Sequence, residues 1–554
     1  MHSWDWVAIT LYFGALLGIT WWTLLKPKDS TSSYFLAGRD VGWFAIACSL
    51  FASNIGSEHL VGLAGQGAKN GVAMAHYELH AWCLLVLGWV MVPFYERSMV
   101  YTMPEFLEKR YTPAARWFLS VMSLVAYVFT KIAVALFAGG IVFKSLFPDP
   151  LFRDIDNFWV GAIGMVLVTG LYTVLGGLRA VVYTEVIQTL VFIIGSALLL
   201  IIGLWKLGGW GALRQSCGSE HFNLWKPLSN PDFPWAGMLF AAPIVGLWYW
   251  TTDQYIVQRT LAARNQMQAR RGTIGAACFK LLPLWIFIVP GMIALALANH
   301  GLLKSDMINE SATLLADANK NSAFPLMVKT ILPVGIRGVV VGGLMAALMS
   351  SLASCFNSSA TLFTMDIYKK LHPKASESTL VWVGRFATLA MVILGLAWIP
   401  FMQYITGGLY EYLQKVQAYV APPIFAVFFL GVFLKRINGT GCMLGLVGGF
   451  IIGMARLVAE ISKAKLTQGT LLYAFADLNF LYFCVLLLVI SVVLIVIGSL
   501  LTAAPSDEKI KGLTYATVTA EHRAETRASW NKWDVITTAG VLAAILATYL
   551  YFNG

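Results

Sequence analysis

Long apolar runs recur along the whole of this 554-residue chain and limit what it can fold into. A helical run of about 20 apolar residues crosses a hydrocarbon core of roughly 30 Å, and about fourteen such runs are present. With 58% hydrophobic and 12% charged residues, the composition excludes an ordinary water-soluble fold. The sequence therefore predicts an all-α polytopic membrane protein whose partner is the lipid bilayer. The runs lie near 5–25, 41–68, 72–97, 114–146, 158–176, 180–206, 234–261, 273–298, 338–369, 379–402, 407–433, 440–458, 479–502 and 534–552.

Basic residues predict the orientation of these spans. The first run has no basic flank before it, and Lys26 and Lys28 follow it, so we interpret it as a retained span rather than a cleaved signal. An external amino terminus places nearly all basic clusters on the cytoplasmic side, and both termini are then external. This bias accounts for the net charge of +11 without a nucleic-acid partner. We expect a multi-pass protein of the plasma or inner membrane, and no obligate protein partner is evident.

No polar stretch between the spans is long enough to form a soluble domain, so residues 1–554 are predicted to form a single membrane domain. Polar residues inside the apolar runs are costly, and they concentrate between the second and eleventh runs. The last three runs contain few of them, which indicates a functional core and a lipid-facing periphery. The seven cysteines form no disulfide framework and no metal-binding motif.

The segment SNIGSEHLVG, from Ser53 to Gly62, places polar residues and glycines inside the second apolar run. Unwinding there would free backbone carbonyls that need a partner in the membrane, and in transporters with broken helices a cation such as Na⁺ supplies it. The ninth run offers complementary oxygens from Ala347, Ser350 and Ser351. The pattern favours a sodium site beside a substrate site. Close packing of small residues explains Ser350 and Ser351 equally well.

Glu78 and Lys280 are each a lone charge within an apolar run. If both face one cavity, they make a polyhydroxylated ligand plausible, because each hydroxyl can donate and accept a hydrogen bond. The aromatic run from Trp248 to Trp250 could stack on a sugar ring. From the pattern alone, an interhelical ion pair with interfacial aromatic residues is the more common explanation. The other polar residues that could join such a site are Asn54, His59 and Gln414.

The remaining buried polar residues have more ordinary interpretations. Lys131 fits a structural cation paired with an acid or a carbonyl, and His80 a buried histidine with satisfied hydrogen bonds. Glu185 and Asp253 lie near predicted cytoplasmic ends, where we expect solvated side chains, and Arg259 is expected to extend its charged end to the interface. No catalytic triad, metalloprotease motif or nucleotide-binding loop stands in a fitting context, so an enzyme is poorly supported.

Several long segments, in order, are similar to the sodium/solute symporter family, and within it most similar to the sodium/glucose cotransporters. They are YFLAGRDVGWFAIACSLFASNIGSEHLVGLAG (34–65), YTMPEFLEKRY (101–111), LYTVLGGLRAVVYTEVIQT (171–189), LWYWTTDQYIVQRTLAAR (247–264) and MSSLASCFNSSATLFTMDIYKK (349–370). The resemblance runs from about residue 30 to 440.

The resemblance implies a LeuT-type fold of about 14 transmembrane helices with two inverted five-helix repeats. The repeats would cover 41–206 and 234–433, with an extra N-terminal helix at 5–25 and peripheral C-terminal helices in 440–554. It also implies a sodium-coupled symporter that imports a monosaccharide such as glucose or galactose by alternating access. Two alternatives stay open: a symporter for another small solute, such as inositol or sialic acid, and a sugar-gated sensor or sodium leak.

Site residues also follow from the resemblance, position by position. The sodium site would use the backbone carbonyls of Ala52, Ile55 and Ala347 with the hydroxyls of Ser350 and Ser351. Leu63 and Tyr410 resemble parts of an outer gate, and Tyr249 resembles the inner gate. The implied substrate-binding residues are Asn54, His59, Glu78, Tyr249, Trp250, Lys280 and Gln414.

Four positions depart from the family pattern. Gly246 stands where sugar transporters tend to place Asn or Thr, which removes one hydrogen bond and blurs the choice among sugars. Glu58 replaces a small residue of animal members, and Glu185 replaces an aspartate. Ala353 lacks the hydroxyl found in members with a second sodium site. We therefore expect Na⁺ as the coupling ion, with one Na⁺ per sugar.

Overall fold

The computed structural model describes residues 2–26, 30–56, 58–147, 150–152, 155–303, 323–402 and 409–554. This part of the chain is nearly all helical, as predicted, and contains isolated β-bridges but no strand. Eleven helices in it are long and apolar enough to cross a membrane. The spans that lie in single long helices are α1 (Ser3–Leu24), α19 (Ile336–Leu362), α21 (Glu377–Met402), α22 (Leu409–Phe433), α23 (Gly439–Ile461), α25 (Phe480–Leu500) and α28 (Lys532–Tyr551).

Other predicted spans are interrupted helices. The second comprises α3 (Trp43–Asn54), the π-helix η2 (Glu58–Leu63) and α4 (Ala64–Asn70), and the third runs from α5 (Ala75–Glu78) through α6 (Ala81–Val86) to α7 (Val92–Ser98). The remaining ones are α9 (Pro113–Ala126) with α10 (Ala133–Leu146), α13 (Trp235–Thr252) with α14 (Gln254–Leu261), and α15 (Gln266–Phe279) with α16 (Val289–Asn299). The third, fourth and eighth predicted spans still count among the eleven. The shortfall from fourteen comes from the breaks in the second and seventh spans and from the joining of the fifth and sixth.

The fifth and sixth predicted spans form one element, α11 (Asn157–Leu207), of 51 residues. Its two parts meet at Gly177, where the backbone leaves the helical region with φ 60° and ψ −162°. A Cβ at this position would lie 2.6 Å from the carbonyl oxygen of Tyr34, so only glycine suits both the dihedral angles and the close approach. The two predicted runs are therefore real, and a glycine joins them without a loop.

Two of the predicted spans are interrupted part-way along their length, and both interruptions position the site. Helix α3 ends at Asn54, and Ile55 has extended dihedral angles (φ −81°, ψ 95°), which confirms the predicted break in SNIGSEHLVG. A second break, which the sequence pattern does not predict, separates α13 from α14 at Asp253 (φ −76°, ψ 126°). Its side chain accepts a hydrogen bond from the backbone N–H of Tyr255 and so caps α14.

Glycines bring the second half of the broken span against α16. A Cβ on Gly67 would lie 2.3 Å from the carbonyl oxygen of Ile288, and one on Gly291 would lie 1.9 Å from that of Ala64. Backbone therefore meets backbone at this contact, as small residues allow between membrane helices. This packing holds α4 in place while the residues between α3 and α4 depart from regular α-helix.

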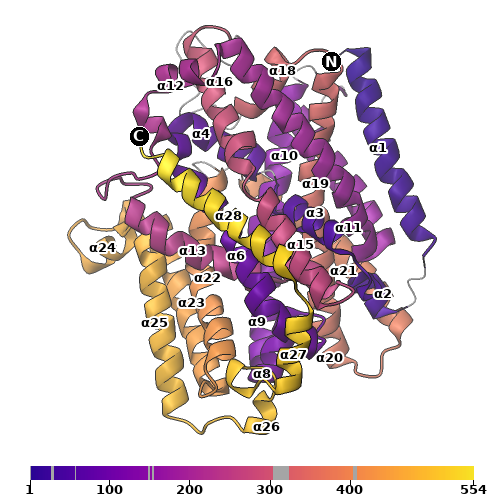
Figure 1. The fold of residues 1–554 in the computed structure, drawn as a ribbon, viewed down its shortest axis with the longest axis vertical. Helices are drawn as coiled ribbons and strands as arrows, with labels where there is room; N and C mark the ends of the chain where they lie inside the picture. Colours follow the sequence, from indigo (N-terminus) through magenta and orange to yellow (C-terminus); the bar gives the residue numbers. More distant parts are fainter. Residues whose placement is uncertain are drawn as a thin grey trace.

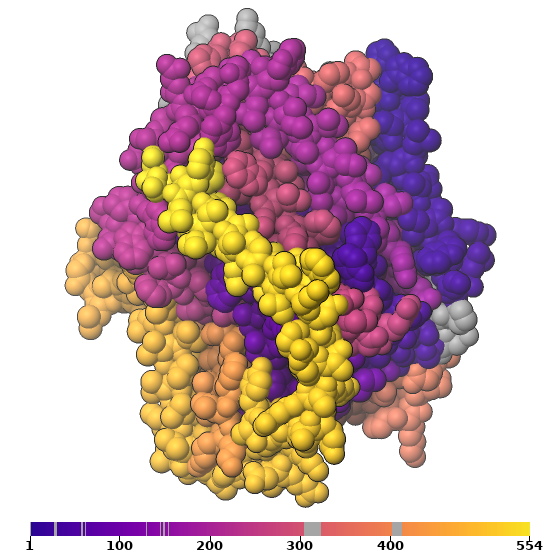
Figure 2. All heavy atoms as spheres, viewed as in Figure 1, coloured from indigo at the N-terminus to yellow at the C-terminus, as the bar shows by residue number. Residues whose placement is uncertain are grey.

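The C-terminal helices lie on the outside of the molecule. Helix α28 crosses the surface diagonally over α15 and α6, and α23 and α25 form one flank (Figures 1 and 2). Large apolar side chains of α28 are exposed, among them Leu546 at 60% and Leu550 at 68%. Both chain ends lie in the upper part of the view, whereas α8 (Met103–Arg110), α20 (Lys369–Leu371) and α26 (Asp507–Ile510) lie at the lower end (Figure 1).

Candidate functional site

All the residues predicted to bind substrate line one central cavity. Asn54 comes from the end of α3, Glu78 from α5, and Lys280 from the C-terminal end of α15. Helix α13 contributes the aromatic wall, and α22 contributes Gln414. The helix breaks create this site, because side chains from chain segments more than two hundred residues apart meet where regular helix stops. The predicted residues on the wall are Asn54, His59, Glu78, Tyr249, Trp250, Lys280 and Gln414.

The Lys280 ammonium is the centre of the polar wall. It donates hydrogen bonds to Glu78 Oε2 at 2.6 Å and to Asn54 Oδ1 at 2.8 Å. His59 Nε2 lies 3.4 Å from the other carboxylate oxygen of Glu78. The ion pair and the cavity are therefore not competing explanations, because the pair is buried and also faces the cavity. Buried charges of opposite sign with a partly satisfied set of hydrogen bonds suit a neutral ligand rich in hydroxyl groups.

Aromatic and amide groups complete the wall. The Tyr249 hydroxyl accepts a hydrogen bond from Asn54 Nδ2 at 3.4 Å, and the Lys280 ammonium lies 5.6 Å from the centre of the Trp250 ring. Gln414 Oε1 is buried and accepts no hydrogen bond within the described residues. An acceptor on the cavity wall without a donor is available to a solute hydroxyl.

Four of the five predicted cation-binding residues also converge: Ala52, Ala347, Ser350 and Ser351. The Ser350 hydroxyl lies 2.9 Å from the carbonyl oxygens of both Ala52 and Ala347. The Ser351 hydroxyl lies 3.4 Å from the Ala347 carbonyl, and Ser351 also lines the central cavity. Oxygens of the broken helix α3 thus meet oxygens of α19 beside the break at Ile55. A neutral set of carbonyl and hydroxyl oxygens suits Na⁺, which needs no carboxylate.

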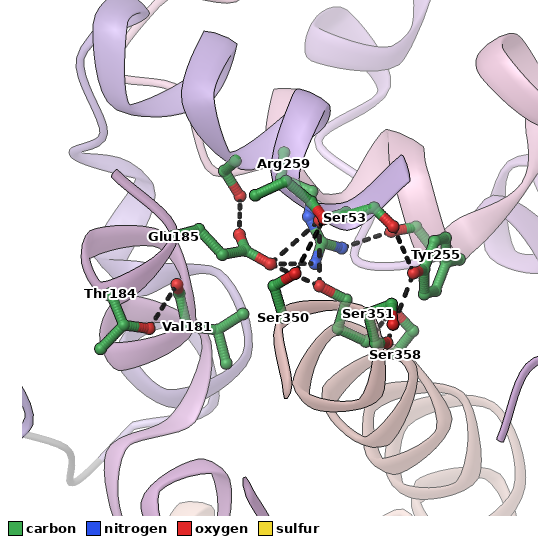
Figure 3. Close-up of polar contacts among 12 residues, drawn as sticks. Ser53, Val181, Thr184, Glu185, Tyr255, Arg259, Ser350, Ser351 and Ser358 are labelled. Carbon is green, nitrogen blue, oxygen red and sulfur yellow. Dashed lines mark hydrogen bonds and ion pairs between the residues drawn. The ribbon is translucent and has the colours of Figure 1, made fainter. Parts of the chain in front are cut away.

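Glu185 contradicts its prediction as a solvated residue, since its side chain is 0% exposed. Figure 3 shows its carboxylate among serine side chains and Arg259. It accepts hydrogen bonds from Ser354 at 2.6 Å, from Ser53 at 3.0 Å and from Ser49. Arg259, which was expected to reach the interface, is also 0% exposed and pairs with Glu185 at 3.7 Å. Both predictions were wrong because α3 and α19 pack against α11 here, and Arg259 of α14 reaches Glu185 between them.

Asp253 is buried as well, contrary to the prediction of a solvated side chain. It accepts a hydrogen bond from Lys131 at 2.8 Å and another from the Tyr127 hydroxyl. The interpretation of Lys131 as a paired structural cation is therefore confirmed. Its ammonium also lies 3.6 Å from the centre of the Tyr255 ring and 4.5 Å from that of Tyr249, so the break at Asp253 is joined to the cavity wall.

The predicted outer gate is only partly described. Leu63 ends η2 and is 0% exposed, and it does not line the central cavity. Tyr410 lies in α22, but its side chain is outside the described residues. Tyr249, the predicted inner gate, lines the cavity beside Lys131 and Tyr255.

Replacing Glu185 with alanine is expected to lower the free energy of unfolding by about 3–5 kcal/mol, because Arg259 would be left buried without an anion. The matched control is Asp40→Ala, which breaks the exposed pair of Asp40 and Arg264, 59% and 61% exposed. That change is expected to cost about 1 kcal/mol or less. Thermal unfolding of the purified variants measures the difference. Equal unfolding temperatures for the two variants would contradict the role of Glu185.

Comparison with known proteins supports the family resemblance seen in the sequence. A sequence profile of the sodium:solute symporter family matches residues 34–449. Sodium/myo-inositol cotransporter 2 of Oryctolagus cuniculus is 38% identical over 543 residues, which covers 93% of this chain and 79% of that protein. Sodium/glucose cotransporter 1 of the same species is 37% identical, with 92% of this chain and 80% of that protein covered.

Solved structures show the fold. A Na⁺-coupled sialic acid symporter in a substrate-bound, outward-open state has a TM-score of 0.75 at 21% identity, covering 91% of this chain and 99% of that one. Mhp1, a nucleobase-cation-symport-1 family transporter in a closed conformation, has a TM-score of 0.50 at 12% identity, covering 88% and 99%. The fold is of the LeuT type.

The family match covers most of the chain, and the arrangement of the helices fits the fold of these transporters. The activity that these matches support is transport rather than catalysis, with Na⁺ as the coupling ion and a small solute as cargo. This multi-pass membrane protein belongs to the sodium:solute symporter family.

Proposed function

We propose that this symporter imports a monosaccharide such as glucose or galactose, and that the residues on the wall of the central cavity bind it. The observation that carries the proposal is the contact of Lys280 with both Glu78 and Asn54 beside the aromatic side chain of Trp250. A sugar offers hydroxyls to such charged and amide groups and an apolar ring face to the aromatic side chain.

A second candidate substrate is a cyclic polyol such as myo-inositol. Relatives named for glucose and for myo-inositol match this chain almost equally well, at 37% and 38% identity. Gly246 on the cavity wall also provides no side chain that would favour a sugar. Both candidates are neutral and rich in hydroxyls, so the polar wall suits either.

Competition measurements separate these candidates. Uptake of labelled glucose in a sodium gradient is measured with excess unlabelled glucose, galactose, myo-inositol or sialic acid. The proposal predicts that glucose and galactose compete most strongly. Stronger competition by myo-inositol would favour the cyclic polyol, and competition by sialic acid alone would contradict both candidates. Saturable sugar-evoked current without accumulation of sugar would instead favour a sensor or sodium leak.

In the proposed mechanism, Na⁺ binds from outside between the carbonyls of Ala52, Ile55 and Ala347 and the hydroxyls of Ser350 and Ser351. It draws the broken end of α3 toward α19 and so completes the sugar site next to it. Sugar binding favours closure at the outer gate, to which we assign Leu63 and Tyr410. Opening to the cytoplasm then separates the two helices, Na⁺ leaves, and Tyr249 moves aside to release the sugar.

The energetics suit accumulation of the solute. We propose a location in the plasma or inner membrane, with both termini external. The membrane potential, negative inside, then drives Na⁺ into the cell. A potential of about 100 mV supplies roughly 2.3 kcal/mol per charge. A tenfold Na⁺ gradient adds about 1.4 kcal/mol. Together they would support accumulation of a neutral solute by a few hundredfold.

One Na⁺ per solute is the expected coupling ratio, because Ala353 on α19 carries no hydroxyl to complete a second cation site. Charge movement and labelled-solute uptake measured on the same vesicles give this ratio directly. For a neutral solute the expected value is one charge per molecule. A ratio near two would contradict it, and Ala353→Ser then serves to test whether a hydroxyl there changes the ratio.

A further inference from the structure

His80 lies on the wall of the central cavity, two residues after Glu78 and next to α6. Its side chain is 3% exposed, and its ring meets the rings of Tyr77 and Trp82 edge-on, with centroid separations of 5.9 and 6.3 Å. The sequence predicted a histidine with satisfied hydrogen bonds. The described residues give neither ring nitrogen a hydrogen bond, so that prediction is not met there, and the ring lines the cavity instead.

Gly246, on the facing helix α13, makes room for this ring. A Cβ built on Gly246 would lie 2.7 Å from His80 Nδ1 and 3.2 Å from the Cys83 sulfur. A side chain at position 246 and the imidazole in its observed place therefore exclude each other. The space that a side chain of α13 would otherwise occupy is filled by a side chain of the third span.

The chemistry of the ring suits a hydroxyl group. A neutral imidazole has one donor and one acceptor, as a hydroxyl does, and a ring at the cavity wall can offer both to a ligand. The polar groups already assigned to the solute, Lys280 and Gln414, line the same cavity. A polyhydroxylated solute in this cavity would therefore meet His80 at the wall where Gly246 offers no hydrogen bond.

We propose that His80, whose imidazole occupies the space left by the missing side chain of Gly246, is a substrate-recognition residue that binds a hydroxyl of the solute. The inference rests on the proposed function, since it takes the solute to be a sugar or cyclic polyol. The pair His80 and Gly246 then contributes to the choice among such solutes.

The first test compares His80→Leu with wild type on the transported solute and on its single-deoxy analogues. The expected result is an increase in the apparent KM of the parent solute of about tenfold, equivalent to roughly 1.4 kcal/mol. The analogue that lacks the contacted hydroxyl should show no such change. His80→Asn, which keeps a polar atom near the position of Nδ1, or His80→Gln, near that of Nε2, should recover part of the affinity.

Two outcomes separate this inference from the proposed function. If wild type accumulates a sugar or polyol and His80→Leu alters the KM of the parent and every analogue equally, or alters none, the assignment of His80 is overturned and the proposed function stands. If wild type transports no polyhydroxylated solute in a sodium gradient, the proposed function fails and this inference fails with it. Size-exclusion profiles of each variant confirm that it folds.

The second test exchanges the two side chains. Gly246→Thr is expected to reduce uptake strongly, because the new side chain collides with the imidazole, and adding His80→Ala should restore uptake. The matched control is Gly246→Val with His80→Ala, which has the same shape without the hydroxyl. Recovery of solute affinity with threonine but not with valine supports recognition through a hydrogen bond. Equal recovery would show that the pair matters for packing only and would overturn the inference.

Discussion

Lys280→Ala is expected to raise the apparent KM for the transported solute by at least about a hundredfold. The ammonium holds Glu78 at 2.6 Å and Asn54 at 2.8 Å on the cavity wall. Removing it leaves a carboxylate buried without its main cation, which typically costs about 3–5 kcal/mol, and each 1.4 kcal/mol is about tenfold in affinity. Solute uptake measured over a range of concentrations at saturating Na⁺ gives the KM.

The variant that separates binding from structure removes both charges. If the pair only joins α5 to α15, Lys280→Ala with Glu78→Ala should restore transport, since no charge remains unpaired. If the pair binds the solute, the double variant should fold and still bind the solute weakly. Lys144→Ala breaks the exposed pair of Lys144 and Asp156 and serves as the control with unchanged KM. If the Lys280→Ala protein has the same KM as wild type, the pair of Lys280 and Glu78 joins two helices and does not bind the solute.

Ser351→Ala is expected to raise the Na⁺ concentration needed for half-maximal uptake by about tenfold, the equivalent of one lost oxygen ligand at roughly 1.4 kcal/mol. The order of preference among sugars should not change, because the hydroxyl is assigned to the cation. The Ser351 hydroxyl lies 3.4 Å from the Ala347 carbonyl oxygen, and Ser351 also lines the cavity. Uptake rates measured against Na⁺ concentration, at constant ionic strength, give the value.

Ser358→Ala is the matched control for the sodium assignment. Ser358 lies on the same helix, is fully buried, and donates to the Ser354 carbonyl at 2.8 Å, so it loses the same kind of hydroxyl about 10 Å along the axis. Its Na⁺ dependence should stay as in wild type. Normal transport by Ser351→Ala at low Na⁺ would show that this hydroxyl does not bind the cation.

The spans and the polar wall of the cavity could be predicted from the sequence, because the bilayer makes an isolated charge conspicuous. Glu78 and Lys280 interrupt apolar runs, and the polar residues of SNIGSEHLVG stand where a regular span has none. Such residues are kept in a membrane only where the fold gives them a partner or a role. The division into two repeats has no visible signature in the sequence and stays a prediction.

The sequence misled where burial depends on neighbouring helices. Glu185 and Asp253 lie near the predicted ends of their spans, and position along a span was taken as a measure of exposure. Three serines and Arg259 surround Glu185 in the structure, and nothing along α11 alone indicates them. His80 was misjudged for a related reason, because its place on the wall depends on the absence of a side chain at Gly246.

The most direct test of sodium-coupled sugar transport uses the purified protein in proteoliposomes. Uptake of labelled glucose is followed with an inward Na⁺ gradient and, in parallel, with an equal K⁺ gradient. Sodium-coupled transport predicts a transient accumulation of glucose above equilibrium with Na⁺ and none with K⁺. Equal time courses in the two gradients, from protein that still binds Na⁺, would contradict sodium-driven transport of this sugar.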